Sequence, residues 1–381
     1  MTRAPVRPEL LRWARERARL STLDLEARFP KLAEWERGEK SPTLKQLDAY
    51  PRATRAPLGY LFLQEPPEER LPIPDFRTMA GRNVVRPTPD LLDTIYLCQG
   101  RQSWYQEFAE QTGQDPLAFV GSTTFRRSPV EVAAEMSHTL GFDLDARHAC
   151  PTWTEALRLF IGQADRAGVL VMVSGVVQNN NTRRLDPAEF RGFALVDRLA
   201  PLVFINGADS KSAQMFTLAH ELAHLWLGES ALSDTTVAST HQNAVETWCN
   251  RVAAELLTPL DVVRTELVPR EPLDRTVPRL TRRFKVSTLV VLRRLLDARH
   301  LSRQAFNRAY EHELERLAER PRSSGGDFYL TTAARVSRRF ARALLESTLE
   351  GRTLSRDAFR MLGISKVETF NELGRSLNFQ I

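Results

Sequence analysis

The feature that most restricts how this chain can fold is a pair of histidines four residues apart inside an apolar run. His220 and His224 enclose Glu221 in the pattern His-Glu-X-X-His, and apolar residues flank the pattern on both sides within 211–227. On an α-helix, positions i and i+4 lie one turn apart on the same face, so both imidazoles can bind one ion. The apolar flanks predict a core helix over 211–227, and Gly228 is expected to end it.

The residue between the histidines has the position that a catalytic base needs. Because a helix turns by about 100° per residue, the side chain of Glu221 is rotated by that angle from the side chain of His220. It then points towards the place where a metal-bound water molecule would lie. Catalytic zinc sites use three protein ligands and keep a further position open. The third ligand must therefore come from another element, and the downstream candidates are Glu229, His241, Glu246 and Glu255.

Among these candidates we favour Glu246, which begins an amphipathic helix expected over 243–257. Asn250 follows one turn later and can hold the N–H of a ligating histidine. Glu255 lies nine residues after Glu246, on the opposite side of the helix, where we expect it to face solvent or form a salt bridge. Glu229 is too close along the chain to fold back across the ion. His241 remains open as a ligand.

Hydrolysis at such a site also needs a donor to the oxyanion that forms on the scissile carbonyl. His241 is one candidate for this role, and Tyr329, in the sequence FYLTT, is the other.

The chain around this helix is expected to be α+β and mostly helical. Three short runs after Gly168, namely VLVMVSGVV, FRGFALVD and PLVFING, are rich in β-branched and aromatic residues. They predict a small three-stranded antiparallel sheet packed on the helix that carries the histidines. PLVFING is expected at an edge, where a substrate segment can add as a further strand. Helical modules flank this region on both sides.

The first sixty residues predict short helices that resemble the helix-turn-helix of Cro/repressor-type (XRE-type) regulators. Ser21 and Pro42-Thr43 mark two helix starts. The stretch from Leu20 to Gly38 is about four residues shorter than in that family, and Pro30 stands where the recognition helix would begin. We therefore expect a shortened module over 1–63 that contributes little to DNA recognition.

Composition predicts the remaining domain boundaries, the charge of each region and the cellular compartment of the chain. A Pro-rich linker is expected over 64–89, the metallopeptidase domain over 90–260 and a basic helical region over 261–381. Residues 1–60 carry a net charge of +5, residues 61–260 of −8 and residues 261–381 of +9. Basic ends can contact nucleic acid or an acidic partner, and the alternative interpretation is that they are solvated Arg-rich helix faces. The three widely spaced cysteines, the absence of a membrane-spanning run and the polar N-terminus indicate a cytoplasmic protein.

The sequence from 186 to 259 resembles the ImmA/IrrE family of zinc metallo-endopeptidases. The resemblance rests on FRGFALVD, PLVFIN, FTLAHELAHLWLG and VETWCNRVAAELLTP in this order, with a weaker similarity at 74–78, PDFRT. It implies that His220, His224 and Glu246 bind one zinc ion, or manganese or another divalent ion, and that Glu221 is the catalytic base. Members of the family cleave a repressor under stress, phage induction or DNA damage. Here the repressor-like helices precede the peptidase region, unlike the order in IrrE-type proteins.

Two functions follow as expectations. The first is a zinc endopeptidase that cleaves a specific regulatory protein, a repressor-like partner, in a stress, phage or toxin–antitoxin response. The alternative is a DNA-binding regulator whose peptidase domain is structural or silent, with contacts from the N-terminal helices, from 284–294 or from 357–370. No individual DNA-contacting residue is assigned. The intact set of metal-binding residues favours the enzyme.

Overall fold

The computed structural model describes residues 4–74, 87–233, 244–318 and 333–379. By its internal contacts the chain divides into two compact units, one comprising residues 1–72 and 83–96 and the other residues 73–82 and 97–381. Among the described residues, no helix combines the length and the apolar character that crossing a bilayer requires.

The N-terminal unit is a cluster of short helices around its own apolar core. Capping boxes at Ser21 and Thr43 begin two of the helices, as the sequence predicts. A bidentate ion pair joins Arg15 to the buried Glu36, with Nε–Oε1 and Nη2–Oε2 distances of 2.7 and 2.9 Å. Its elements are α1 (Pro8–Arg17), α2 (Thr22–Glu26), α3 (Leu32–Glu36), α4 (Leu44–Thr54) and the 3-10 helix η1 (Leu58–Phe62).

The larger unit is mostly helical and contains one small sheet. Its first helix, α5 (Pro89–Gln111), begins within the N-terminal unit. The elements that follow are α6 (Pro129–Leu140), α7 (Leu144–Ala149), α8 (Trp153–Arg166), β1 (Leu170–Ser174), β2 (Gly192–Leu195), β3 (Leu202–Asn206), α9 (Lys211–Leu227), β4 (Ala231–Ser233), α10 (Ala244–Leu257), α11 (Leu260–Thr265), α12 (Leu273–Phe284), α13 (Thr288–Asp297), α14 (Arg303–Ala318), α16 (Arg338–Leu349), α17 (Ser355–Leu362) and α18 (Val367–Ser376).

The sheet differs from the prediction in its strand number and its topology. The described residues form four strands in the order β1-β3-β2-β4, and β1 pairs with β3 in parallel while the other pairs are antiparallel. The prediction of a three-stranded antiparallel sheet was therefore wrong, because β4 is only three residues long and the β1–β3 pairing joins strands that are not consecutive. The predicted edge strand, β3, lies in the interior, and all five of its residues are buried.

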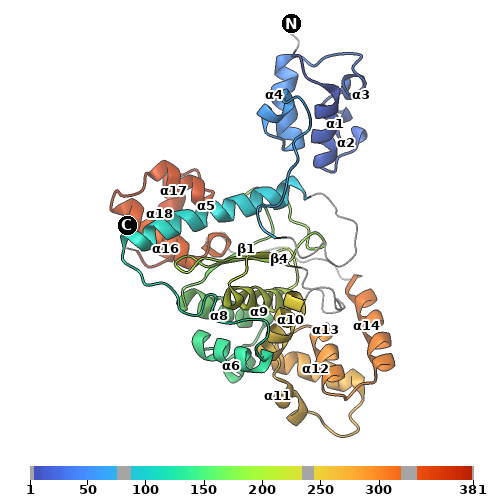
Figure 1. The fold of residues 1–381 in the computed structure, drawn as a ribbon, viewed down its shortest axis with the longest axis vertical. Coiled ribbons are helices and arrows are strands. Elements are labelled where there is room, and N and C mark those ends of the chain that lie inside the picture. Colours follow the sequence, from blue (N-terminus) through green and yellow to red (C-terminus); the bar gives the residue numbers. More distant parts are fainter. Residues whose placement is uncertain (1–3, 75–86, 234–243, 319–332, 380–381) are drawn as a thin grey trace. The chain divides into compact units, whose positions relative to one another are not determined.

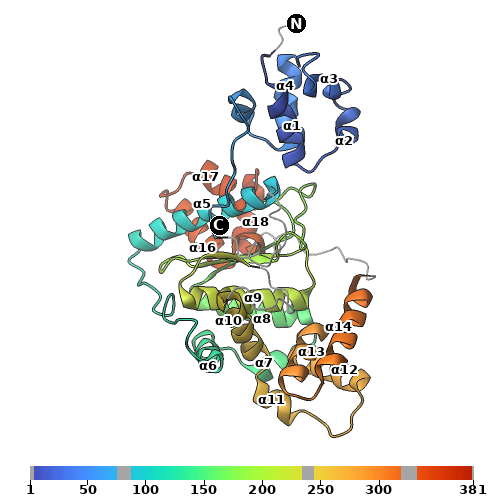
Figure 2. The same ribbon diagram turned by 45° about the vertical axis from the view of Figure 1, so that its right-hand side comes forward.

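Helices cover both faces of this sheet (Figures 1 and 2). On one side α9 contacts β2 and β3, and α8 contacts β1 and α9. On the other side lie the second half of α5 and helices α16 to α18, and α16 also contacts β1 and α8. Gln102 of α5 fixes this layer by donating from Nε2 to the carbonyl oxygens of Leu195 and Ala200, at 3.0 and 2.9 Å. The helix with the histidine pair is consequently enclosed between the sheet and further helices.

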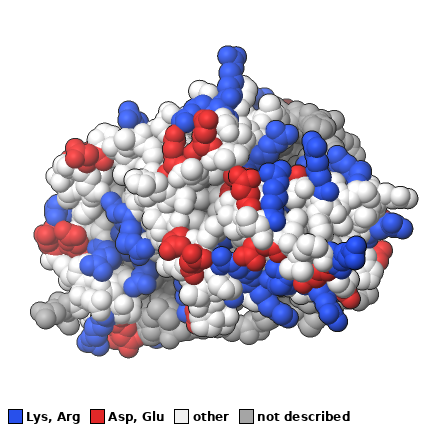
Figure 3. Space-filling view, turned by 90° about the horizontal axis from the view of Figure 1, so that it is seen from below, with Lys and Arg blue, Asp and Glu red and all other residues white. Residues whose placement is uncertain are grey.

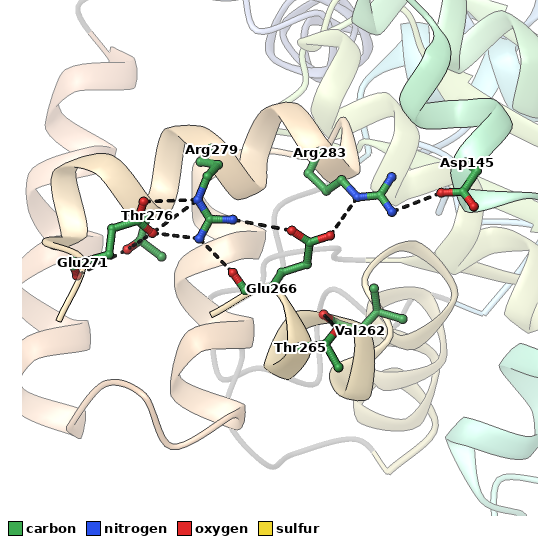
Figure 4. A network of polar contacts seen from close by, with 8 residues as sticks. All are labelled: Asp145, Val262, Thr265, Glu266, Glu271, Thr276, Arg279 and Arg283. Carbon is green, nitrogen blue, oxygen red and sulfur yellow. Dashed lines mark hydrogen bonds and ion pairs between the residues drawn. The ribbon is translucent and has the colours of Figure 1, made fainter. Parts of the chain in front are cut away.

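Several of the arginines that make residues 261–381 basic form ion pairs with acidic residues of the same unit. Arg279 of α12 binds Glu271 with an Nη2–Oε2 distance of 2.7 Å and also contacts Glu266 (Figure 4). Arg283, one turn further on, contacts both Glu266 and Asp145 of α7, each at 3.1 Å. These ion pairs connect α12 to α7, so part of the basic charge has a structural role.

The partly buried Asp165, at the end of α8, connects this helix to the segment before α16. Its Oδ1 accepts a hydrogen bond of 3.1 Å from the hydroxyl of Ser337. Burial raises the pKa of Asp165 to about 7, although Ser337 and the neighbouring Arg338 and Arg339 act in the opposite direction. The folded protein therefore holds a proton here at pH values where the unfolded chain has released it.

We expect Asp165→Asn to flatten the pH dependence of stability between about pH 4 and 7. The raised pKa gives a stabilisation that is complete below the unfolded value and is lost as the pH rises through about 7. Above pH 7 the variant should be more stable than the wild type, by on the order of 1 kcal/mol. Urea unfolding at pH 5, 6, 7 and 8 measures this, with the exposed Asp115→Asn as the control. Parallel pH profiles for wild type and Asp165→Asn would refute the expectation.

Candidate metal centre

The helix that carries the histidine pair, α9, begins and ends at the predicted residues. Ser210 caps its first turn by accepting from the backbone N–H of Ala213, and Gly228 ends it in the left-handed conformation with φ +78°. Every residue from Gln214 to Trp226 is buried. The apolar flanks of the histidines thus hold them inside the core rather than on a solvated face.

Three buried side chains converge beside α9. The Nε2 atoms of His220 and His224 lie 3.2 Å apart, and they lie 3.2 and 3.1 Å from Oε2 and Oε1 of Glu246, respectively. Glu246 stands in the first turn of α10, which packs against α9. Among the described residues this is the one group of three or more potential ligands close enough together to hold a metal ion.

The separation of these atoms fits a tetrahedral ion. Zinc binds imidazole nitrogen and carboxylate oxygen at about 2.0–2.1 Å, which places tetrahedral ligand atoms about 3.3–3.4 Å from one another. The distances of 3.1–3.2 Å between the Nε2 and Oε atoms are close to this value. Two nitrogens and one oxygen also leave a fourth position for water or substrate, as in catalytic rather than structural zinc sites.

The protonation states favour metal binding at neutral pH. Burial alone would raise the pKa of Glu246, but the adjacent His220 and His224 lower it to about 2, so this carboxyl group is ionised. Burial lowers the pKa of His224, although the hydrogen bond that its ring makes to the Glu246 carboxylate acts in the opposite direction, so this imidazole is neutral. An ionised carboxylate and neutral imidazoles are the forms that bind metal.

Asn250 lies where the sequence predicts a residue that orients a ligand. Its Oδ1 is 3.1 Å from Nδ1 of His220, the nitrogen that faces away from Glu246. An acceptor at this place favours the proton on Nδ1 and leaves the Nε2 lone pair for a metal. Asn250 and Glu246 are four residues apart on α10, so one helical turn supplies both contacts.

The other candidate ligands of the sequence analysis lie elsewhere. Glu255 pairs with Arg294, with an Oε2–Nη2 distance of 2.5 Å, and also accepts from the backbone N–H of Leu260. Glu229 follows the end of α9 and is not in the convergent group. His241 and Tyr329, the candidate oxyanion donors, lie outside the described residues.

Glu221 is completely buried, and strand β2 approaches it closely. A side-chain Cβ at Gly192 would lie 2.5 Å from Cγ2 of Thr217, 2.8 Å from the carbonyl oxygen of Phe204 and 3.2 Å from Oε1 of Glu221. Only glycine fits between the sheet and α9 here. The sequence analysis missed Gly192, although a glycine inside a strand pattern is a known sign of close backbone approach.

Gly192→Ala should therefore destabilise the protein by about 1–3 kcal/mol, the usual cost of overpacking, and should displace Glu221. The rigid carbonyl of Phe204 cannot be avoided by a rotamer change, so β2 or α9 must shift. Denaturant unfolding measures the loss. The control is Gly100→Ala, because a Cβ at Gly100 meets no atom within 4 Å. Equal stability of the two variants would contradict the close contact.

Comparison with known proteins relates this region to metallopeptidases. Residues 164–296 match the family model Peptidase_M78, described as an IrrE N-terminal-like domain, and residues 336–376 match a domain of unknown function, DUF8813. Over 101 residues the chain is 35% identical to the radiation response metalloprotease IrrE of Deinococcus deserti, covering 25% of this chain and 36% of the relative. The protein of the same name from Deinococcus radiodurans is 33% identical over 101 residues, covering 25% and 31%.

These matches support a metallopeptidase domain that contains α9 and α10. The chain spans about a third of the length of both curated relatives. The matched region includes both histidines, Glu221 and Glu246, so the similarity and the geometry indicate a divalent-metal centre at the same residues.

Proposed function

We propose that this chain is a zinc-dependent endopeptidase that cleaves one regulatory protein, a repressor-like partner. The observation that carries the proposal is the convergence of His220, His224 and Glu246 in a buried site, with Glu221 on the same helix. A structural metal site would need no carboxylate beside its ligands and would have four protein ligands. Here three ligands and a buried acid form the set that metal-assisted hydrolysis requires.

The residues of this site have separate roles in peptide hydrolysis. A bound zinc ion would lower the pKa of water and polarise the scissile carbonyl. His220, His224 and Glu246 would hold the ion, and Asn250 would orient the imidazole of His220. Glu221 would take a proton from the attacking water and pass it to the leaving amine. Gly192 permits this role because it lets β2 approach without displacing the Glu221 carboxylate.

Selection of the partner is proposed to depend on surfaces outside the metal centre. A groove of about 490 Å³ runs along a face of α10 that does not include Glu246, and its lining includes Arg126, Trp248 and Arg251. Such a groove suits an acidic segment, and complementary charge mainly raises the encounter rate and the selectivity. Strand addition at β3 is ruled out by its interior position, and at β4 the N–H of Leu232 already donates to Pro74 at 2.9 Å.

The biological setting is part of the proposal. The two relatives carry names that describe a radiation response, and we extend this to a stress, phage or toxin–antitoxin response that releases transcription. We place the protein in the cytoplasm, where thiols stay reduced. Its three cysteines, of which Cys98 and Cys249 are buried, are all free.

The test is to trap the partner with a variant that binds but does not cleave. Full-length Glu221→Gln should retain on affinity resin a protein that the wild type converts to two fragments. Glu229→Gln, which removes a carboxylate near the site but outside the ligand group, serves as the control and should behave as the wild type. The proposal fails if the wild type, Glu221→Gln and Glu229→Gln retain the same proteins on the resin and the wild type cleaves none of them.

The alternative, a DNA-binding regulator, has its best support in the N-terminal helices, yet their surfaces do not suit base recognition. The helix in the recognition position, α3, has only five residues, and it buries Leu32, Trp35 and Glu36. Among the remaining two, Glu34 pairs with Lys40. Apart from these helices, the face drawn in Figure 3 shows basic side chains interspersed with acidic ones. Phosphate contacts favour clustered positive charge instead.

Deleting residues 1–60 should leave the affinity for double-stranded DNA within about twofold of the full chain. The reason is that α3 offers a major groove few outward side chains. Fluorescence anisotropy with operator-like and scrambled duplexes at fixed salt measures both affinities. A sequence-dependent loss of tenfold or more would show that the N-terminal unit reads DNA and would favour the alternative.

A further inference from the structure

A second groove lies in the larger unit, and none of its lining residues belongs to the metal centre. It has a volume of about 580 Å³ and is formed by α5, α8 and α16. This volume is typical of sites for small organic ligands. Residues that matter for its chemistry are Tyr105, Phe108, Arg166, Arg338, Arg339 and Arg342.

The four arginines in the groove lack the acidic partners that other arginines of this unit have. Arg279, Arg283 and Arg294 each bind a glutamate within 3.1 Å. In contrast, no ion pair joins any of the four groove arginines to a carboxylate of the described chain. Asp165 and Glu346 also line the groove, and Arg338 and Arg339 act on the charge of Asp165 without forming an ion pair with it, so the two carboxyl groups offset only part of the positive charge of the four arginines.

Neutral groups hold two of these arginines in place. Arg339 donates from Nε to the hydroxyl of Tyr105 at 2.7 Å and from Nη2 to Oε1 of Gln114 at 3.2 Å. Arg342 donates from Nη1 to the carbonyl oxygen of Leu377 at 3.1 Å, and its guanidinium lies 5.4 Å from the centre of the Phe379 ring. Such contacts fix the donors without neutralising them, so a ligand need not order them itself.

The floor of the groove is apolar. Tyr105, Phe108 and Ala343 line it and are each at least nine-tenths buried. The groove thus combines a cationic rim with an apolar surface. This combination suits a molecule that carries anionic oxygens at one end and a flat or apolar body at the other.

We propose that this groove binds a phosphate ester of nucleotide size. Guanidinium groups match phosphate oxygens because their planar N–H donors form paired hydrogen bonds, and several arginines together suit more than one phosphate. The sugar or base would lie over the floor. The groove includes Asp165 and Arg166, at the start of the peptidase match, and residues of α16 within the DUF8813 match, so a bound ligand would contact both regions.

The experiment is calorimetric titration of the full chain with ADP, GDP and pyrophosphate, with adenosine as the probe without phosphate. The variant is Arg338→Ala/Arg342→Ala. The control is Arg356→Ala/Arg360→Ala, which removes the same charge from two exposed positions on α17. We expect ADP or GDP to bind saturably to wild type and control, and about tenfold or more weakly to the groove variant. Saturable binding of pyrophosphate alone would contradict a ligand of nucleotide size. Circular dichroism melting verifies that both variants are folded.

Each other outcome contradicts the proposal. Absence of saturable binding of all three phosphate probes up to about 1 mM would leave the groove without the affinity expected of a ligand site. Equal weakening in both double variants would indicate general charge attraction. Adenosine binding as tightly as ADP would show that phosphate is not recognised. Groove-dependent binding of a 20-base-pair duplex without nucleotide binding would assign the arginines to nucleic acid.

Discussion

Glu221→Gln is expected to lower the rate of cleavage of the trapped partner by about 10²–10⁴-fold, the usual contribution of a general base. Glutamine keeps the shape of the side chain but cannot accept the water proton. Because Glu221 is not among the three convergent ligands, metal content should remain at wild-type level. Single-turnover cleavage followed by mass spectrometry measures the rate.

The matched control for this prediction is Glu229→Gln, which should cleave at the wild-type rate. Cleavage by Glu221→Gln at that same rate would exclude Glu221 as the base. A loss of rate together with a loss of metal would instead mean that Glu221 acts through the metal site and not as a proton acceptor.

Removal of one metal ligand is expected to reduce bound metal from about one equivalent per chain to a small fraction. His220→Ala and Glu246→Ala each leave two of the three converging atoms, which is too few for a catalytic zinc site. Stabilisation by added metal should be lost as well, since a ligand at 100 times its Kd stabilises a folded protein by about 2.7 kcal/mol. Elemental analysis and thermal unfolding with and without zinc measure both effects.

The control for metal removal is His148→Ala, which deletes an exposed histidine of α7 and should change neither quantity. Full metal retention by either ligand variant would refute the assignment. Manganese or iron in the native protein would not, because related sites select metals partly by availability while the ligands stay the same.

Local sequence signals predicted the elements that carry the site. The bounds of α9 followed from an apolar run with Gly228 after it, and the structure adds Ser210 as the N-cap. The four-residue spacing of Glu246 and Asn250 placed both on one helical face, and the structure brings both to His220. Such inferences succeed because helical periodicity and capping depend on residues close in sequence.

Contacts between distant segments could not be read in the same way. The parallel pairing of β1 with β3 depends on tertiary packing, which decides strand order, and β4 is too short to give a pattern. The four groove arginines come from α8 and α16, about 170 residues apart, and nothing in the sequence distinguishes them from the paired Arg279 and Arg283. Because Arg279 and Arg283 are paired with acidic residues, the net charge of residues 261–381 overstates the positive charge that is unpaired at the surface.

X-ray absorption at the zinc edge of the zinc-loaded full chain measures whether His220, His224 and Glu246 hold a metal for hydrolysis. We expect one zinc ion with nitrogen and oxygen ligands at about 2.0–2.1 Å, including the scattering signature of two imidazoles. In Glu246→Ala the first coordination shell of the zinc ion should differ from that of the wild type. A sulfur shell at about 2.3 Å, which would indicate Cys249, or a spectrum without imidazole scattering would refute the assignment of these three ligands.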